Sequence, residues 1–431
     1  MRKLAPLLLA VIGSLFLCKS LHAQATLPAI LAGPRRPFPQ HTSYAPGTLR
    51  LDRRTQAQQD DDARVYYDAW KSSFLVQAGN ASDGSPLYRI TVGSGNPSRT
   101  VSEGQGYGMM IVAFMAGYDR DAQTVFDGLW RFARKYPSSI DSRLMSFEVP
   151  FDPLNFNSAF DGDCDIAYAL LLADAQWGST QAINYRAEAQ KVIAGILAST
   201  IGPDSRLPML GDWVDAKGET YNQYTPRSSD FMLDNFRAFE RANGDPVWAR
   251  VVAEVQAVIT SLQTNYSPNT GLIPDFIVPT SKGDHTAKPA PPNFLEAATD
   301  GAYAYNAGRV PWRLGADALL NNDPVSLAQT RKITQWALAT TGGNPYQIRA
   351  GYALDGTPIN ANAFTIFFAA PLGVAAMTDP AQQEWFNQIY DSVYARHEDY
   401  YEDSVTLLCL LVMTHNTWSP SIAKRRAVRP S

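Results

Sequence analysis

The chain has 431 residues, of which 45% are hydrophobic, 11% aromatic and only 18% charged, a composition that indicates a large, well-buried core and an aromatic-lined surface. Its 37 basic residues are outnumbered by 41 acidic ones, and this mild acidity argues against nucleic acid as a partner. Three cysteines are too few for a disulfide framework, and we expect Cys164 and Cys409, in apolar stretches, to be buried free thiols. The five histidines have no metal-ligand spacing and no HExxH or CxxC motif occurs, so we expect neither a metal ion nor a cofactor.

Residues 1–25 have the layout of a secretory signal peptide. The segment begins with Arg2 and Lys3, continues through a mostly apolar run, and ends in small residues at Ala23 and Ala25. The apolar run is shorter than the ~20 residues that span a bilayer, which argues against a membrane anchor. We therefore expect an exported protein, either periplasmic or secreted, that does not associate with a membrane.

The rest of the chain is organised as a leader, one long domain and a short tail. Residues 26–53 are rich in proline and arginine and need not form a core of their own. A single helical domain is predicted over residues 54–418, followed by a tail at 419–431. Twelve segments with helical spacing of apolar residues lie in this domain, at 54–76, 102–118, 121–136, 161–178, 184–201, 228–244, 246–266, 304–322, 323–343, 364–377, 380–398 and 400–416.

These twelve segments form six pairs in which the two members differ in kind. One member, such as 121–136, is amphipathic, whereas its partner, such as 102–118, is apolar nearly all round. An all-apolar helix is buried and an amphipathic one covers it, so we predict an all-α (α/α)6 barrel with minor β structure in the loops. A solenoid of helical hairpins is the alternative, although no sequence repeat supports it. The long connections lead into the predicted inner helices and would line a cleft at one end of the ring.

A first candidate for chemistry is Glu103, in the stretch TVSEGQGYGMM. Gly104, Gly106 and Gly108 would remove side chains from around its carboxylate and allow a bulky substrate to approach. A glutamate in the first turn of a helix can also be a plain cap. Three glycines would be costly in an ordinary helix, which favours the functional interpretation.

A second candidate is the acidic stretch that contains Asp161, Asp163 and Asp165 before a strongly apolar segment. Alternating aspartates occur in calcium loops, but no glutamate follows at the twelfth position. Helix capping explains one of the three, and the others indicate that at least one faces a cleft. Aromatic residues in nearby loops would suit the apolar faces of sugar rings as well as they would a core.

The motifs SEGQGYGM, FDGDCDIAYALLLADAQW and YNAGRVPWRLGAD resemble glycoside hydrolase family 8, a family of inverting, endo-acting enzymes on β-1,4-linked glucan, xylan and chitosan. YYDAWKSSF at 66–74 and YYEDSVTLL at 400–408 are similar to that family's first and last helices. The resemblance runs over residues 60–416 and implies an (α/α)6 barrel. It also implies that Glu103 is the general acid and that Asp161 contacts the sugar at the scissile centre.

The position that follows the tyrosine in the third motif departs from the family's best-known members, which carry an aspartate base there. This chain has Asn306, and an amide cannot deprotonate water. In the chitosanase-like branch, which RSSDFMLDNFRAF at 227–239 also resembles, the base is a glutamate ten residues earlier. The resemblance therefore implies that Glu296 is the base, with Asp300 as the competing candidate.

Other roles follow from the same resemblance. Asn306 would position the attacking water, and Arg309 would either pair with a carboxylate or brace its loop. Tyr107, Trp213 and Tyr401 are candidates for contacts with the sugar. The expected partner is a β-1,4-linked polysaccharide, bound by a monomer.

The choice of polysaccharide stays open. The branch resemblance favours chitosan, whose cationic amino groups would be attracted by Asp212, Asp230 and Asp234, but cellulose-like or mixed-linkage β-glucan is also expected to be cut. A cellulase or licheninase without chitosanase activity is the first alternative. A carbohydrate-binding protein without catalysis is another, and a lyase on uronic acids fits poorly with an acidic chain that has few histidines.

Overall fold

The computed structural model describes residues 33–93, 95–150, 156–281, 284–359 and 364–420, so the predicted signal peptide and most of the predicted tail lie outside the described residues. The chain divides into two units, Met1–Gly33 and Pro34–Ser431, and the description that follows concerns the second. Among the described residues no helix has the length and apolar character needed to cross a membrane. Cys164 and Cys409 are buried and free, as expected.

The described residues form twelve α-helices, one in each predicted segment. They are α1 (Gln56–Phe74), α2 (Ser102–Phe114), α3 (Ala122–Lys135), α4 (Phe160–Trp177), α5 (Tyr185–Ser199), α6 (Leu233–Asn243), α7 (Val247–Asn265), α8 (Val310–Asn321), α9 (Pro324–Thr341), α10 (Ile366–Ala376), α11 (Gln383–Val393) and α12 (Tyr400–Met413).

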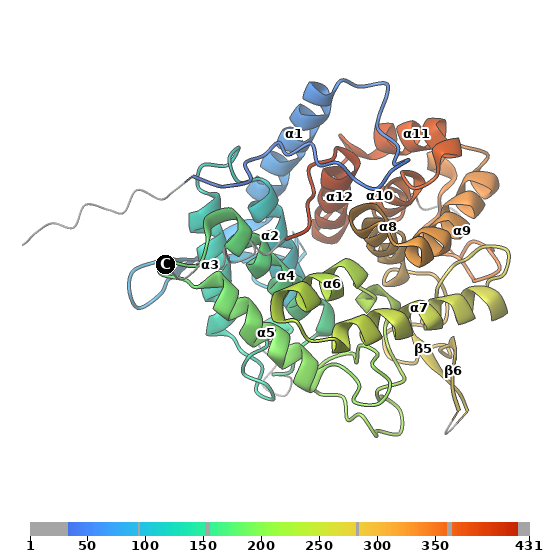
Figure 1. Ribbon diagram of the computed structural model, residues 1–431, viewed down its shortest axis with the longest axis horizontal. Helices are drawn as coiled ribbons and strands as arrows, with labels where there is room; N and C mark the ends of the chain where they lie inside the picture. The colour runs from blue at the N-terminus through green and yellow to red at the C-terminus, as the bar shows by residue number, and fades with distance from the viewer. Residues whose placement is uncertain (1–32, 94, 151–155, 282–283, 360–363, 421–431) are drawn as a thin grey trace, which may run out of the picture. The chain divides into compact units, whose positions relative to one another are not determined.

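The even-numbered helices form a closed inner ring. Each of α2, α4, α6, α8 and α10 packs against the next even-numbered helix, and α12 returns to α2. The odd-numbered helices lie outside this ring, with α3 on α2, α5 on α4, α7 on α6, α9 on α8, α11 on α10 and α1 on α12 (Figure 1). A solenoid would not close on itself, so the predicted (α/α)6 barrel is confirmed.

The sequence explains which helices are inside. Every residue of α10, IFFAAPLGVAA, is buried. The outer helix α3 instead buries Phe126 and Leu129 on one face and exposes Lys135. A helix that is apolar all round has to be surrounded by protein, whereas an amphipathic helix has one face for the core and one for water.

The three glycines of α2 serve helix packing. A Cβ on Gly104 would lie 2.7 Å from the hydroxyl of Tyr400, and one on Gly108 would lie 2.5 Å from the side chain of Ile90. A Cβ on Gly106 would lie 2.8 to 3.3 Å from atoms of α4. The glycines therefore let neighbouring elements approach α2, and the interpretation that they clear room for a substrate is wrong.

Minor β structure occurs in the connections, as predicted. The strands pair antiparallel in three two-stranded sheets, β1 (Leu75–Asn80) with β2 (Pro86–Ile90), β3 (Thr100–Val101) with β4 (Glu148–Val149), and β5 (Ile277–Ser281) with β6 (Asp284–Pro289). Short 3₁₀ turns also occur, at η1 (Ser228–Asp230), η2 (Ala307–Arg309), η3 (Pro345–Gln347) and η4 (Pro380–Gln382). Two predicted helices, 228–244 and 304–322, therefore begin later than expected, because η1 and η2 precede α6 and α8.

The described part of the leader is a strap across the C-terminal ends of the inner helices. Backbone N–H groups of the strap donate to backbone carbonyls at or just beyond these ends, from Arg35 to Gln176, Phe38 to Ala116, Thr42 to His415, Ala45 to Leu319 and Leu49 to Met377. Phe38 and Leu51 are buried in the main core. The long connections lie at the opposite, N-terminal ends of the inner helices, where the candidate site is found.

Candidate active site

The candidate site is centred on Arg309, the last residue of η2, whose side chain is 1% exposed. Its Nη1 donates to Oε2 of Glu103 over 2.7 Å and to Oδ2 of Asp161 over 2.9 Å. The same nitrogen donates to the hydroxyl of Tyr107 over 3.1 Å. A guanidinium presents several donors in a fixed plane, so this one side chain joins carboxylates from α2 and α4.

The other terminal nitrogen of Arg309 braces the neighbouring loops. Nη2 donates to Oγ of Ser229 over 2.8 Å and to Oδ1 of Asn306 over 3.2 Å. Both roles left open for Arg309 are therefore present, because it pairs with carboxylates and also fixes the turn that contains Asn306.

Asp161 lies in the first turn of α4 between two arginines. Its Oδ1 is 3.0 Å from Nη2 of Arg227, and its Oδ2 accepts the bond from Arg309. Burial raises the pKa of Asp161, but the positive charges of Arg227 and Arg309 outweigh burial. The pKa of Asp161 is therefore held well below its usual value. Asp161 is thus held as a carboxylate, which cannot donate a proton.

Glu103, in the first turn of α2, has the opposite tendency. Burial raises its pKa, and this effect outweighs Arg309, while the negative charge of Asp161 raises the pKa further. The hydroxyl of Tyr400 donates to Oε1 of Glu103 over 3.0 Å. Because 17% of the Glu103 side chain is still exposed, a ligand can reach this carboxyl group.

Glu296 reaches the same cluster from the loop before η2. Its Oε2 accepts a hydrogen bond from Nδ2 of Asn306 over 2.8 Å, and its Oε1 is 3.8 Å from Nη1 of Arg227. The side chain is 46% exposed, so water reaches it freely. The two glutamates are therefore joined by a continuous chain of hydrogen bonds through Arg309 and Asn306.

Asp300, the competing candidate for the base, has a different position. It is 1% exposed, and its two oxygens accept backbone N–H groups from Leu295, Glu296 and Ala297 over 2.7 to 3.0 Å. All the hydrogen bonds that the structure shows for this carboxylate fix the turn that carries Glu296. Asp300 is thus turned toward the loop backbone, whereas Glu296 is turned toward the cluster.

The aromatic candidates differ in accessibility. Tyr107 is fully buried, so it is placed to brace Arg309 and offers no ring face to a sugar. Tyr401 lies beside the cluster, with the Arg309 guanidinium 5.7 Å from its ring centroid. Trp213 lies further out and packs edge-on against Tyr221, which contacts the loop that carries Glu296.

Two polar residues of the cluster, Arg227 and Ser229, were not singled out from the sequence, although Arg227 contacts Asp161 and Ser229 contacts Arg309. Tyr400, which contacts Glu103, is one of the aromatic residues near the acids in the sequence, without a role assigned there. The only sequence signal for Arg227 and Ser229 is the stretch RSSD at 227–230, which resembles the chitosanase-like branch. Their contacts join residues far apart in the chain, which a linear pattern does not show.

The aspartates expected to attract a cationic polymer are buried. Asp212 accepts from Ser138 and from backbone N–H groups, and Asp234 accepts from Tyr168 over 2.6 Å. Asp230 is fully buried beside Arg227. The electrostatic argument for chitosan is therefore wrong, because none of these three carboxylates faces solvent.

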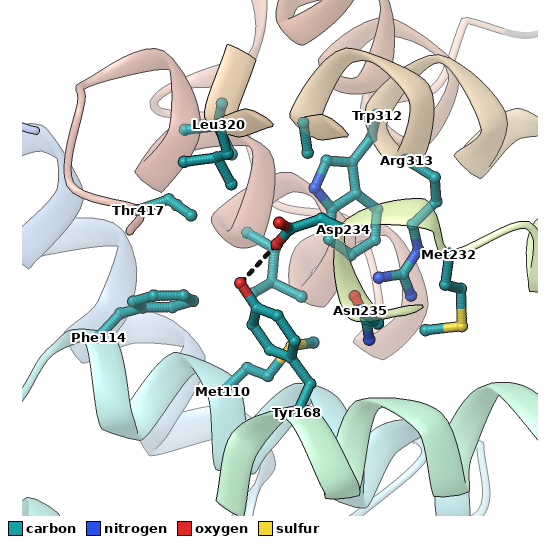
Figure 2. Close-up of a pocket in the computed structure, with 13 residues that line it drawn as sticks. Met110, Phe114, Tyr168, Met232, Asp234, Asn235, Trp312, Arg313, Leu320 and Thr417 are labelled. Carbon is teal, nitrogen blue, oxygen red and sulfur yellow. Dashed lines mark hydrogen bonds between the residues drawn. The ribbon is translucent and has the colours of Figure 1, made fainter. Parts of the chain in front are cut away.

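A separate cavity of about 40 Å³ lies inside the ring (Figure 2). Trp312 and Arg313 line it on one side, and Tyr168 donates to Asp234 on the other. Arg313 also pairs with Asp165 over 2.7 Å, which accounts for the last aspartate of the acidic stretch. None of Glu103, Asp161 and Glu296 lines this cavity, so it is distinct from the candidate site.

Known proteins match this chain over most of its length. A model of Glycosyl hydrolases family 8 matches residues 49–415. A beta-glucanase of Niallia circulans is 41% identical over 392 residues, 90% of this chain and 92% of the relative. An endoglucanase of Bacillus sp. strain KSM-330 is 38% identical over 405 residues, 92% of this chain and 84% of the relative.

A solved structure has the same architecture. The apo structure of a beta-1,3-1,4-glucanase from Paenibacillus sp. X4 superposes with a TM-score of 0.84 at 40% identity, and covers 90% of this chain and all of that one. The family match, at residues 49–415, extends over the whole helical ring and every residue of the cluster. The protein therefore belongs to glycosyl hydrolase family 8 and is a glycoside hydrolase.

Proposed function

We propose that this protein is an endo-acting β-glucanase that cuts β-1,4 linkages in soluble β-glucan, including mixed-linkage glucan, with inversion at the anomeric carbon. The names of its relatives, a beta-glucanase, an endoglucanase and a beta-1,3-1,4-glucanase, support the substrate class. The observation that carries the mechanism is the pairing of a protonation-prone Glu103 with a solvent-accessible Glu296 across Arg309 and Asn306. Its export under the direction of residues 1–25 is part of the same proposal.

Glu103 acts as the general acid in this mechanism. A general acid has to hold a proton at the working pH, and the burial that raises the pKa of Glu103 favours the protonated form. Asp161 adds negative charge beside it but stays ionised between its two arginines. Glu103 gives its proton to the glycosidic oxygen as the bond to the anomeric carbon breaks, and Asp161 stabilises positive charge on the sugar ring.

Glu296 acts as the general base. Its exposed carboxylate takes a proton from a water molecule, whose oxygen then attacks the anomeric carbon. The amide nitrogen of Asn306 donates to one oxygen of Glu296 and so orients the base. In the best-known members of the family, the residue at the position of Asn306 is an aspartate, which is itself the base. A single displacement of this kind inverts the configuration, and it needs about 6.5–9.5 Å between the two carboxyl groups to admit the water.

Chitosan is a second candidate substrate, and one observation favours it. Resemblance to the chitosanase-like branch implies an asparagine at position 306 and a glutamate base ten residues earlier, and a hydrogen bond of 2.8 Å joins Asn306 to Glu296. Chitosan differs from cellulose at C2 alone, so the same acid and base would serve both polymers.

The function is tested by release of reducing ends from mixed-linkage β-glucan, carboxymethylcellulose and chitosan. We expect activity on mixed-linkage glucan, and loss of at least about 10²-fold in Glu103→Gln and Glu296→Gln, the scale of general acid–base catalysis. Adding azide to Glu296→Ala should restore turnover and give a glycosyl azide, because the small anion can attack from the place of the water. Asp300→Ala serves as the matched control, since a loosened loop is not rescued by azide. Absence of hydrolysis of all three polymers would overturn the proposal.

A further inference from the structure

Arg227 contacts three carboxylates that come from three different segments. Its Nη2 is 3.0 Å from Oδ1 of Asp161 on α4, and its Nε donates to Oδ1 of Asp230 on η1 over 3.1 Å. Its Nη1 is 3.8 Å from Oε1 of Glu296, on the loop before η2. The Arg227 side chain is 14% exposed, so its contacts with the buried Asp161 and Asp230 form largely out of water, where ionic contacts are strongest, whereas the contact with Glu296 lies at the solvent-exposed edge of the cluster.

The charges around Arg227 define its role. The charged groups that face it are Asp161, Asp230, Glu296 and a second cation, Arg309. Asp161 pairs with both arginines, so Arg227 shares this carboxylate with Arg309 and also reaches Glu296. Among the residues that the structure describes, Arg227 is the cation within ion-pair distance of Glu296, and Asp275 is an acid that interacts with Glu296.

Asp230 anchors the other side of Arg227. It is fully buried, its Oδ1 accepts from Arg227 and Ser229, and its Oδ2 has no hydrogen-bond partner among the described side chains and backbone. Burial raises its pKa to about 7, against the opposing effect of Arg227. Asp230 thus holds the Nε side of the Arg227 guanidinium from within the core.

We propose that Arg227 is a positioning residue for the general base: its guanidinium is anchored on Asp230 and holds the Glu296 carboxylate at a fixed position relative to Asp161. The inference rests on the proposed function of Glu296. An exposed side chain on a loop has many rotamers, and two fixed partners, Asn306 on Oε2 and Arg227 on Oε1, select one of them.

Arg227→Ala and Arg227→Lys test this role through kcat and KM on mixed-linkage β-glucan. In Arg227→Ala the base loses one of its two fixed partners, so kcat should fall on the order of 10²-fold, the cost of a misplaced catalytic group, while KM changes little. Arg227→Lys keeps the charge but cannot span three carboxylates, so it should lose less kcat than Arg227→Ala.

Arg237→Ala is the matched control, because Arg237 also joins two aspartates, Asp317 and Asp323, but lies outside the cluster. It should lower the melting temperature without changing kcat. Asp230→Asn keeps a side-chain oxygen that can accept from Arg227, so its kcat should fall less than that of Arg227→Ala.

Two results would overturn the inference. The first is an Arg227→Ala enzyme that melts at a lower temperature but keeps the wild-type kcat, which would make Arg227 a purely structural residue. The second is a kcat that falls as far in Arg237→Ala as in Arg227→Ala, which would trace the loss to general destabilisation. If the wild-type enzyme releases no reducing ends, the proposed function fails, and the inference fails with it. If the wild type is active, the comparison of the variants with it tests the role of Arg227 alone.

Discussion

The protonation of Glu103 depends on opposing neighbours. Burial and the charge of Asp161 raise the pKa of Glu103, while Arg309 and the hydroxyl of Tyr400 lower it. Burial also keeps the Tyr400 hydroxyl protonated, so it stays a donor across the ordinary pH range. The alkaline limb of the activity profile reports the loss of the proton from Glu103.

Tyr400→Phe should move this alkaline limb to higher pH. The lost hydrogen bond stabilised the ionised form of Glu103, so its removal raises the pKa and the acid keeps its proton longer as pH rises. The measurement is kcat/KM against pH, with kcat at the optimum changed less than in Glu103→Gln. A limb that moves to lower pH would show that Tyr400 does not act on Glu103 as a donor.

At the site, the acids could be predicted from the sequence, but the residues that contact them could not. Glu103, Asp161 and Asn306 were recognised from local motifs, and Glu296 was chosen over Asp300 by resemblance alone. The backbone bonds to Asp300 separate the two candidates on physical grounds, because they orient it into its own loop. Partners such as Arg227 could not be found in this way, since the ion pair with Asp161 joins residues 66 positions apart.

Helices α2 and α4 pack closely against each other, and this packing brings Glu103 and Asp161 together. Gly106 is the residue of α2 that faces α4, where a Cβ would lie 2.8 Å from Cβ of Asp165 and 3.1 Å from the carbonyl oxygen of Gly162. The closeness of the two helices therefore depends on the absence of a side chain, and it sets the separation of the acid from Asp161.

Gly106→Ala should destabilise the protein by about 1–3 kcal/mol, although alanine is the better helix former, because overpacking moves α2 away from α4. Urea unfolding followed by circular dichroism measures the change. Gly95→Ala is the control, since a methyl group there would enter open space. Equal stability of Gly106→Ala and the wild type would show that the two helices do not depend on this contact.

Among the elements, hydrophobic periodicity predicted all twelve helices but not the starts of α6 and α8. At both starts the chain first makes a 3₁₀ turn, η1 before α6 and η2 before α8. Arg309 of η2 donates to Ser229 of η1 and to Asn306, which directly precedes η2. These local departures from the helical pattern are therefore found at the functional residues.

At the scale of the whole molecule, the site and the strap occupy opposite ends of the ring. The site gathers at the N-terminal ends of the inner helices, and the strap crosses their C-terminal ends. The sequence marked residues 26–53 as a leader without a core of its own, and did not show that part of it would pack on the barrel.

A chain that begins at residue 50 should be less stable than one that begins at residue 33. The loss should be about 3 kcal/mol or more, the order expected from the buried Phe38 side chain alone. The kcat of the folded fraction should be unchanged, because the strap does not contact the site. Thermal melting with activity assays below the transition measures both, and equal melting temperatures of the two chains would contradict this role for the strap.

The stereochemistry of the first product tests the central claim, that Glu103 and Glu296 act as acid and base in a single displacement. Proton NMR of early products from mixed-linkage β-glucan resolves the anomeric signals before mutarotation mixes them. The account predicts that the α-anomer appears first and the β-anomer grows in later. A β-anomer that appears first would mean retention through a covalent intermediate, and would contradict the assignment of Glu296 as a base.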